Sequence, residues 1–456
     1  MPSPEEAIHT SATSRNASPA AAPPLSANEP TRVVVVHGGA RDNYQLALAL
    51  QEHGMLEAFV TDLFWPQDAA WARLLERTLP ERVKTLLRQR SQVGLPAVRI
   101  QQTAMSGFLA HIADRLSVLP FSTRRAIRRL SDARLGQFAG NLARRTGTGL
   151  VSYSYYGYQA FRAYRKPAIL FQLHPHPETM RHILQQELAE HPECAASLNL
   201  EWELALPPAD FQRLVDESHS ASHYLVASSF TRQSLIDHGV SPGAIDVIPY
   251  GVDLQRFRPL PVKAASDATL QLLFVGRINQ RKGLSYLLEA LKLLAGKDVH
   301  LTICGRVVDD LQIFAPFANQ VTIRPSVSAE ELVLAYQTAD LFVFPSVGEG
   351  FGQVLLEAIA CGLPVLSTTH TAAPDLIEDG VQGFIVEPRR PDLLADRITW
   401  ALTHREDLAE MGRNARLRAE QFPWTKFRTR CAQAIQRAQQ LSAGAPLYEP
   451  AQSTHP

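Results

Sequence analysis

Hydrophobic and polar positions follow one another in blocks that predict a strand, a tight turn and a helix. Residues 33–36, VVVV, form a β-branched run typical of a buried strand, and the glycine pair at 38–39 predicts the turn. Apolar side chains then recur at helical spacing from 44 to 53. This succession opens a doubly wound α/β domain, in which helices cover both faces of a parallel sheet.

Later blocks continue the pattern through the first half of the chain. Residues 70–146 predict mostly helix, and Ser229 is placed to open another helix. Further strands are predicted at 149–155, 167–174, 223–228 and 244–251.

A second series of strands and helices follows a short linker at 258–268, PLPVKAASDAT. Its clean alternation predicts another parallel sheet, and the residues from 390 to 443 predict helix. Strands are predicted at 270–276, 299–305, 321–325, 341–346, 364–369 and 383–387, with helices at about 283–296, 329–339 and 353–362.

The length of 456 residues exceeds one ordinary core and fits two domains. We expect two Rossmann-like α/β domains facing across a cleft, with ligands bound at the carboxyl ends of their strands. The predicted divisions are a disordered tail at 1–30, an N-terminal domain at 31–257, a linker at 258–268, a C-terminal domain at 269–423, a helix crossing back to the first domain at 424–445 and a disordered tail at 446–456.

Charge and cysteine content exclude several classes of protein. The formal net charge is +0, so nucleic acid is not an expected partner. None of the four cysteines lies in a C-x-x-C pair, which argues against a zinc cluster or a disulfide framework and favours reduced, partly buried thiols. The sequence has neither a signal-peptide core nor a run of about 18 apolar residues. We therefore expect a cytoplasmic protein.

The stretch FVGRINQRKG is the first candidate site. Gly276 follows a strand and permits a sharp turn, after which Arg277 and Lys282 precede a helix. Two cations beside a helix N-terminus suit a diphosphate, because the amide dipoles and both side chains act together. The alternative is a solvated turn with two surface charges, and these residues alone leave both open.

The stretch PSVGEGFGQVLLEAIACGLPVL is the second candidate. Backbone N–H groups of residues 350–352, Gly-Phe-Gly, are placed at the start of a helix, where they can hold phosphate or sugar oxygens. Glu349 in that loop can accept hydrogen bonds from sugar hydroxyls, although an exposed loop carboxylate is the alternative. Glu357 has apolar neighbours on both sides, which argues against a wet helix face and favours ligand hydroxyls in a cleft.

Two further candidates come from the first half. Gly38 and Gly39 follow the first strand, and a tight strand–helix connection explains them without a ligand. His174 ends a strand in LFQLHPHPE, where it can reach a sugar hydroxyl or the reacting centre. A structural role for this histidine is the alternative.

The middle of the first half is basic: residues 73–145 hold 15 Lys or Arg and 4 Asp or Glu. Within it, STRRAIRRLSDARLGQFAGNLARR can form a basic amphipathic helix. Such a helix can dock on anionic lipid at the inner face of a membrane. An ordinary helix with a solvated basic face is the alternative, and the residues favour it slightly.

Four segments together carry a family resemblance: VIPYGVDLQRFRP, FVGRINQRKGLSYLLEAL, AYQTADLFVFPSVGEGFGQVLLEAIACGLPVL and VQGFIVEP. In this order and spacing, the chain resembles the retaining nucleotide-sugar glycosyltransferases of the GT-B fold, glycosyltransferase family 4 (glycosyl transferases group 1). The resemblance is close over about residues 220–430. Tyr250 departs from it, since the family often has Asn there.

The resemblance implies a role for each matching position. Arg277 and Lys282 would bind the donor diphosphate, Glu349 and His174 would lie near the donor sugar, and Glu357 would hold the nucleotide ribose. The base would be met by loops near 305–306 and 324–325. The residues expected to bind the donor are Gly38, Gly39, Gly276, Gly305, Arg306, Gly350, Phe351, Gly352 and Glu357, and those expected to act in catalysis are Glu349, Arg277, Lys282 and His174.

The resemblance also implies transfer to a glycan or lipid-linked acceptor with retention of anomeric configuration, by front-face attack. No Asp-x-Asp motif lies near these elements, so we expect neither metal nor cofactor. A sugar-nucleotide epimerase or hydrolase on the same fold, or a non-catalytic partner that binds nucleotide sugars, are the rival interpretations. The sugar, the nucleobase and the roles of Arg41, Asp42 and Tyr44 are not specified by the sequence.

Overall fold

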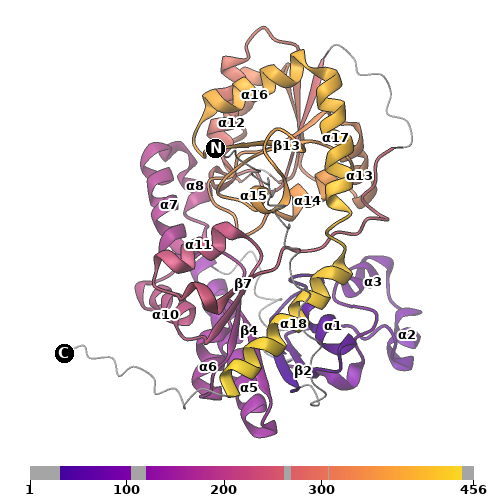
Figure 1. The fold of residues 1–456 in the computed structure, drawn as a ribbon, viewed down its shortest axis with the longest axis vertical. Helices are drawn as coiled ribbons and strands as arrows, with labels where there is room; N and C mark the ends of the chain where they lie inside the picture. The colour runs from indigo at the N-terminus through magenta and orange to yellow at the C-terminus, as the bar shows by residue number, and fades with distance from the viewer. Residues whose placement is uncertain (1–30, 104–119, 261–268, 307, 444–456) are drawn as a thin grey trace, which may run out of the picture. The chain divides into compact units, whose positions relative to one another are not determined.

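The structure is a computed structural model that describes residues 31–103, 120–260, 269–306 and 308–443 (Figure 1). The predicted tails at 1–30 and 446–456 lie outside the described residues, as does most of the predicted linker. The predicted divisions of the chain therefore stay predictions.

The first half forms a seven-stranded sheet in which every neighbouring pair is parallel. Its order, β3-β2-β1-β4-β5-β6-β7, reverses direction beside β1, as in a doubly wound domain. The four valines of β1 are all buried, because helices cover both faces of the sheet. The strands are β1 (Val33–Val36), β2 (Leu56–Thr61), β3 (Ile100–Gln102), β4 (Gly149–Tyr153), β5 (Ile169–Gln172), β6 (His223–Val226) and β7 (Ile245–Val247).

The described part of 70–146 is mostly helix, as predicted, and the short strand β3 interrupts it by pairing with β2 through Phe59 and Ile100. Residues 104–119 of the same region lie outside the described structure. The main helices of this half are α1 (Gln45–Glu52), α2 (Ala70–Glu76), α3 (Glu81–Arg88), α5 (Phe121–Thr146), α6 (Gly157–Tyr164), α7 (Pro177–Glu190), α10 (Pro208–His219) and α11 (Ser229–Asp237), with the short α8 (Ala195–Leu198) and α9 (Trp202–Ala205).

The second half confirms the second predicted parallel sheet. Its six strands have the order β10-β9-β8-β11-β12-β13. The strands are β8 (Leu270–Val275), β9 (Val299–Cys304), β10 (Val321–Arg324), β11 (Leu341–Phe344), β12 (Val365–Thr368) and β13 (Gly383–Val386), and the helices are α12 (Leu284–Leu293), α13 (Ala329–Thr338), α14 (Gln353–Ala360), α15 (Ala373–Leu376), α16 (Pro391–Thr403) and α17 (Arg405–Ala419).

The last helix, α18 (Trp424–Ala443), returns to the first half and packs against α1 and β6 (Figure 1). Arg428 of α18 forms an ion pair with Glu52 of α1 at 2.7 Å. The chain passes close to itself where this helix begins, since a Cβ on Gly251 would lie 2.5 Å from the Cα of Trp424. The glycine retained in the PYGVD turn therefore serves this crossing.

All four cysteines are buried thiols outside any disulfide. Among the helices that the structure describes, none has the length and apolarity needed to cross a bilayer.

Candidate active site

A cavity of about 930 Å³ is lined by residues from both halves of the chain. It lies where the loops after several parallel strands meet, which is the expected position for a ligand in such folds. Seven of the candidate residues line it: Gly38, Gly39, His174, Gly276, Arg277, Gly305 and Arg306.

The second half contributes two adjacent loops to this cavity. Gly276 ends β8 and Gly305 ends β9, and a Cβ on Gly305 would lie 1.8 Å from the carbonyl oxygen of Gly276. The φ of Gly305, 155°, also favours glycine. The N–H of Ile278 donates to the carbonyl of Arg306 at 2.9 Å, so the loops that carry Arg277 and Arg306 are held together.

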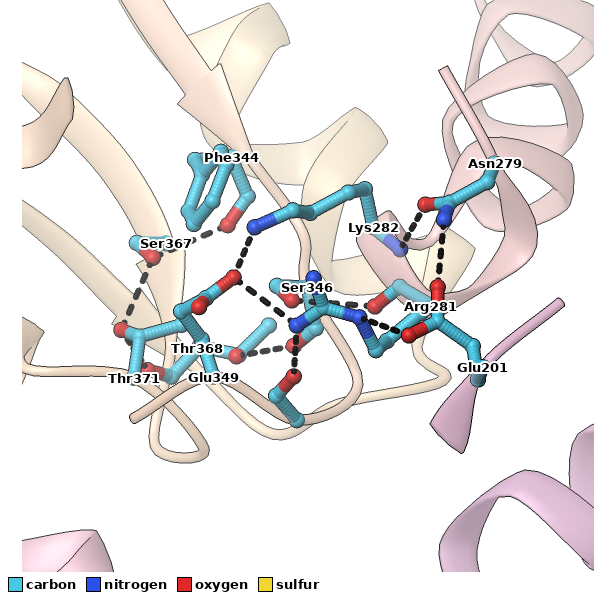
Figure 2. Close-up of polar contacts among 11 residues, drawn as sticks. Glu201, Asn279, Arg281, Lys282, Phe344, Ser346, Glu349, Ser367, Thr368 and Thr371 are labelled. Atoms are coloured by element: carbon cyan, nitrogen blue, oxygen red, sulfur yellow. Dashed lines mark hydrogen bonds and ion pairs between the residues drawn. The ribbon is translucent and has the colours of Figure 1, made fainter. Parts of the chain in front are cut away.

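Lys282 lies beside this cavity in a cluster of charged side chains. Its Nζ contacts Oε2 of Glu349, and Arg281 Nη1 donates to the same oxygen at 3.1 Å (Figure 2). Only 12% of the Lys282 and Glu349 side chains is exposed. One carboxylate thus contacts two cations, which brings Lys282 and Arg281 together beside the cavity.

A residue of the first half completes the cluster. Glu201 pairs with Arg281 Nε at 3.3 Å and accepts from Asn279 Nδ2 at 2.8 Å (Figure 2). Burial and the neighbouring Arg281 guanidinium lower the pKa of Lys282 well below its usual value, while the Glu201 carboxylate opposes that shift. The sequence analysis missed Arg281 and Glu201, although Arg281 directly precedes Lys282.

The Gly-Phe-Gly turn lies against the first half of the chain. A Cβ on Gly350 would lie 1.9 Å from the carbonyl oxygen of Leu173, so glycine is required for this approach. The carbonyl of Gly350 accepts from Ser228 Oγ at 2.6 Å and from Thr231 Oγ1 at 3.2 Å. The Phe351 ring is buried, so only its backbone could meet a ligand. The donor-binding role of these amides stays a prediction.

His174 links the turn and the cavity. It is half-buried, and its ring lies 5.9 Å from that of Tyr155, edge-on. Burial, helped by the cationic Arg281, Arg41 and Lys282, lowers the pKa of His174 to about 3. The imidazole is therefore neutral near pH 7 and can donate or accept a hydrogen bond there.

Glu357 is separate from the cluster, one turn into α14. It accepts a hydrogen bond from Tyr336 Oη at 3.0 Å. Burial raises the pKa of Glu357 to about 7, while Tyr336 and Arg256 oppose the shift. Neither Glu357 nor Glu349 lines the main cavity as described, so the cavity and the two glutamates form adjoining parts of the candidate site.

The first glycine loop is held by a buried carboxylate. Asp62, at the end of β2, accepts from the N–H of Gly39 at 2.8 Å. Arg41 lines the cavity, whereas Asp42 accepts from the N–H of Leu46 at 2.9 Å and so supports the start of α1. Tyr44 is buried in the core. Of the three loop side chains with open roles, only Arg41 is placed to meet a ligand.

Tyrosines after β4 also line the cavity and were missed by the sequence analysis. Tyr155 has a φ of 80°, which is strained for a bulky residue. Glu217 accepts from the N–H groups of Tyr155 at 2.7 Å and Tyr158 at 3.0 Å, and burial raises the pKa of Glu217 to about 7. The run SYSYYGYQ contained the signal, since several tyrosines follow a strand end.

Comparisons with known proteins decide the family of the second half. The model of the family described as glycosyl transferases group 1 matches residues 261–418. These residues contain the Arg277–Lys282 loop and both glutamates. Residues 261–418 therefore form a segment of the glycosyl transferases group 1 family. The resemblance in the second half is thereby confirmed, and the two parallel sheets are those of the GT-B fold.

Curated relatives match part of the chain. The D-inositol 3-phosphate glycosyltransferase of Mycolicibacterium gilvum is 37% identical over 235 residues, which are 47% of this chain and 50% of that protein. The protein of the same name from Paenarthrobacter aurescens is 34% identical over 233 residues, or 47% of this chain and 56% of that protein. The chain thus spans about half the length of the curated relatives it matches.

Solved structures match over a greater length at lower identity. Sucrose-phosphate synthase from Thermosynechococcus elongatus has a TM-score of 0.60 and 18% identity, covering 91% of this chain and 100% of that one. Anabaena HepE, solved with UDP-glucose, has a TM-score of 0.57 and 18% identity, covering 89% and 100%. At this identity the likeness establishes the GT-B fold of the chain and nothing further.

Proposed function

We propose that this protein transfers a sugar from a nucleotide-diphosphate sugar to an acceptor hydroxyl, with retention of anomeric configuration. The observation that carries the proposal is the contact of Lys282 and Arg281 with Glu349 beside a cavity lined by both halves. The family match and the named activities of the curated relatives support the same reaction class.

The donor is assigned to the wall formed by the second half. Arg277, exposed in the cavity, and Lys282 are the cations that bind its diphosphate, and Gly39 allows the first glycine loop to approach it. Glu349 accepts hydrogen bonds from the sugar hydroxyls, and the neutral His174 accepts or donates one. Glu357, further along α14, accepts from the ribose hydroxyls.

The chemistry follows from the charges that develop during transfer. The bond between the anomeric carbon and the diphosphate oxygen breaks, the acceptor oxygen forms a bond on the same face, and its proton passes to the departing phosphate. Negative charge grows on the leaving group, where Arg277 and Lys282 stabilise it. Positive charge grows on the sugar ring near Glu349. We propose that this route requires no metal ion.

The compartment and the class of product are proposed in general terms. We place the reaction in the cytoplasm, in the assembly of a polysaccharide, a lipopolysaccharide or a glycolipid, with a glycan or lipid-linked acceptor. The support for this setting is the family resemblance over residues 220–430.

Acceptor-dependent release of nucleotide tests the proposed function. The full chain is supplied with UDP-, GDP- and ADP-hexoses, with and without a panel of glycan and lipid-linked acceptors. We expect one donor to release its nucleoside diphosphate mainly when an acceptor is present. Lys282→Ala should remove this release, whereas Lys292→Ala, an exposed position on the following helix, should not. Release that ignores the acceptor would favour hydrolysis, and release unchanged in Lys282→Ala would contradict the site.

A further inference from the structure

Four arginines near the start of the basic helix predicted in the first half lie on one side of that helix. In α5, the sequence RRAIRR places pairs at 124–125 and 128–129. Residues four apart lie on the same face of a helix. Arg124 therefore lies beside Arg128, and Arg125 lies beside Arg129. All four arginines line the cavity described above.

Close packing holds α5 at the cavity. A Cβ on Gly136 would lie 2.3 Å from the carbonyl oxygen of Tyr156, and one on Gly140 would lie 2.1 Å from that of Ala160. These glycines let α5 press directly on the backbone of α6, whose first turn follows the cavity tyrosines. The rotation of α5, and hence the direction of its arginines, is set by this contact.

The cavity lining is strongly cationic. Among the described lining residues, the arginines outnumber the carboxylates by nine to three. The segment 104–119, which the structure leaves undescribed, contains one Asp and one Arg by sequence and so does not change this balance. The nine arginines are Arg41, Arg90, Arg124, Arg125, Arg128, Arg129, Arg213, Arg277 and Arg306, and the three carboxylates are Asp132, Asp210 and Glu217.

Carboxylates near α5 are shared between arginines. Asp210 pairs with Arg129 at 3.0 Å and with Arg213 at 2.8 Å. Asp62 lies 3.7 Å from Arg90 and 3.9 Å from Arg128. Two carboxylates thus contact four arginines here, in keeping with the cationic lining of the cavity. Excess charge of one sign in a concave site raises the local concentration of ligands of the opposite sign.

We propose that the α5 arginines bind a phosphate group carried by the acceptor. Several guanidinium groups converging on one space match the oxygens of a phosphate, with paired N–H donors. The donor diphosphate has its own cations in the second half, whereas these arginines belong to the first half. The inference rests on the proposed function, since it names the acceptor of the same site.

Aromatic residues beside the arginines can hold the remainder of the acceptor. Arg125 lies over the Trp202 ring at 5.1 Å, and Arg41 lies 5.9 Å from the ring centroids of Tyr155 and Tyr156. Flat rings of this kind pack against the apolar faces of sugars and cyclic polyols. The phosphate can therefore belong to a soluble phosphorylated sugar or polyol, or to a lipid-linked sugar.

Calorimetric titration of the full chain separates these sources. UDP, GDP and ADP are present in excess, so that phosphate binding at the nucleotide position is suppressed. The soluble probes are inorganic phosphate, glucose 6-phosphate and myo-inositol 1-phosphate, with glucose and myo-inositol as uncharged partners. The lipid probe is N-acetylglucosaminyl diphosphate linked to a short polyprenol in neutral detergent micelles, with empty micelles as its partner.

We expect at least one phosphorylated probe to bind while its uncharged partner does not. Arg124→Gln and Arg129→Gln should each weaken that binding by about tenfold, because each removes charge-assisted hydrogen bonds to phosphate. Arg134→Gln, an exposed position on the same helix outside the cavity lining, should bind as the wild type does. Binding of only the soluble probes or only the lipid probe supports the proposal and identifies the source.

Two results would overturn the proposal. One is that no phosphorylated probe binds the wild-type chain. The other is that Arg124→Gln and Arg129→Gln bind every probe as tightly as Arg134→Gln does, with all three variants folded by circular dichroism. Since the titration requires no turnover, loss of phosphate binding with intact sugar transfer would refute this subsite alone. Arginine-dependent binding without any transfer would instead refute the proposed function.

Discussion

Lys282 and Glu349 contact each other although 67 residues separate them, and Arg281 donates to the same oxygen of Glu349. The contact exists because β8 and β11 are neighbours in the sheet, so the loops after these strands meet. A carboxylate that holds two largely buried cations is costly to remove and is well placed to exchange partners with a diphosphate.

Neutralising Glu349 should destabilise the folded protein. Glu349→Gln leaves Lys282 as a buried cation without its carboxylate and leaves Arg281 with Glu201, so we expect a loss of about 3 kcal/mol in the free energy of unfolding. Lys282→Met combined with Glu349→Gln should recover much of that loss, because one buried cation is also removed. Urea unfolding of the four proteins measures this coupling. If the double variant lost as much free energy of unfolding as the two single variants together, the contact between Lys282 and Glu349 would contribute nothing.

Glu357 should make donor affinity depend on pH. Because the pKa of this carboxyl is about 7, it is mostly protonated in mildly acidic solution and cannot accept from both ribose hydroxyls. Nucleoside diphosphate affinity should therefore increase as the pH rises from about 5 to about 8. Titration calorimetry of the wild type and Glu357→Gln checks this, and the variant should lose most of the rise. An identical rise in both proteins would place its source elsewhere.

The Glu357 carboxyl should also make the stability of the folded protein depend on pH. Donor affinity rises with pH, whereas this contribution to stability falls. The pKa of Glu357 is raised on folding, so the folded protein holds its proton while the unfolded chain releases it between the usual value of 4.5 and about 7. This contribution to stability is complete below the lower value and is lost as the pH rises through the upper one. Glu357→Gln should flatten that fall in the unfolding midpoint, and an unchanged slope would argue against the raised pKa.

The sequence predicted the parallel architecture because buried parallel strands appear as continuous apolar runs, as in Val33–Val36. It did not predict β2, whose run LEAFVT contains Glu57, or β3, which is three residues long. The short β3 exists through its pairing with Phe59 and its neighbours in β2, and such a tertiary contact leaves little trace in local pattern.

The candidate site was predicted in part for a similar reason. The motifs identified Lys282 and Glu349 one by one, but their contact depends on strand order, which a single sequence does not give. The arginines of α5 were interpreted as a membrane-binding or solvated face. Four of them line the cavity instead, because the close approach of Gly136 and Gly140 to α6 determines the rotation of the helix. Membrane contact through residues 73–145 stays a prediction.

Gly350→Ala should destabilise the protein far more than an alanine at an open glycine. The new Cβ would meet the carbonyl oxygen of Leu173, a backbone atom that cannot rotate away, and the expected cost is about 2 kcal/mol or more. Gly243→Ala is the control, since nothing lies within 4 Å of its Cβ position. Thermal unfolding of both variants makes the comparison. Equal midpoints would show that the turn does not approach the first half so closely.

His174 should assist transfer as a neutral hydrogen-bonding group. With its pKa at about 3, it does not titrate in the working range. His174→Asn should lower kcat by about tenfold, the value of one lost hydrogen bond, and leave the shape of the pH–rate profile unchanged. Rate profiles of both proteins from about pH 5 to about pH 8 provide the check. If one limb of the pH–rate profile disappeared in His174→Asn, we would assign proton transfer to His174 instead.

The most direct test of the account is the rate and anomeric configuration of the product formed from the donor that the nucleotide-release assay identifies. Proton NMR of the glycosylated acceptor reads the configuration, and the initial rate is compared among the wild type, Lys282→Ala and Lys292→Ala. We predict a product with the donor's configuration, a rate in Lys282→Ala lower by about a hundredfold or more, and an unchanged rate in Lys292→Ala. An inverted product, or equal rates in all three proteins, would contradict the account.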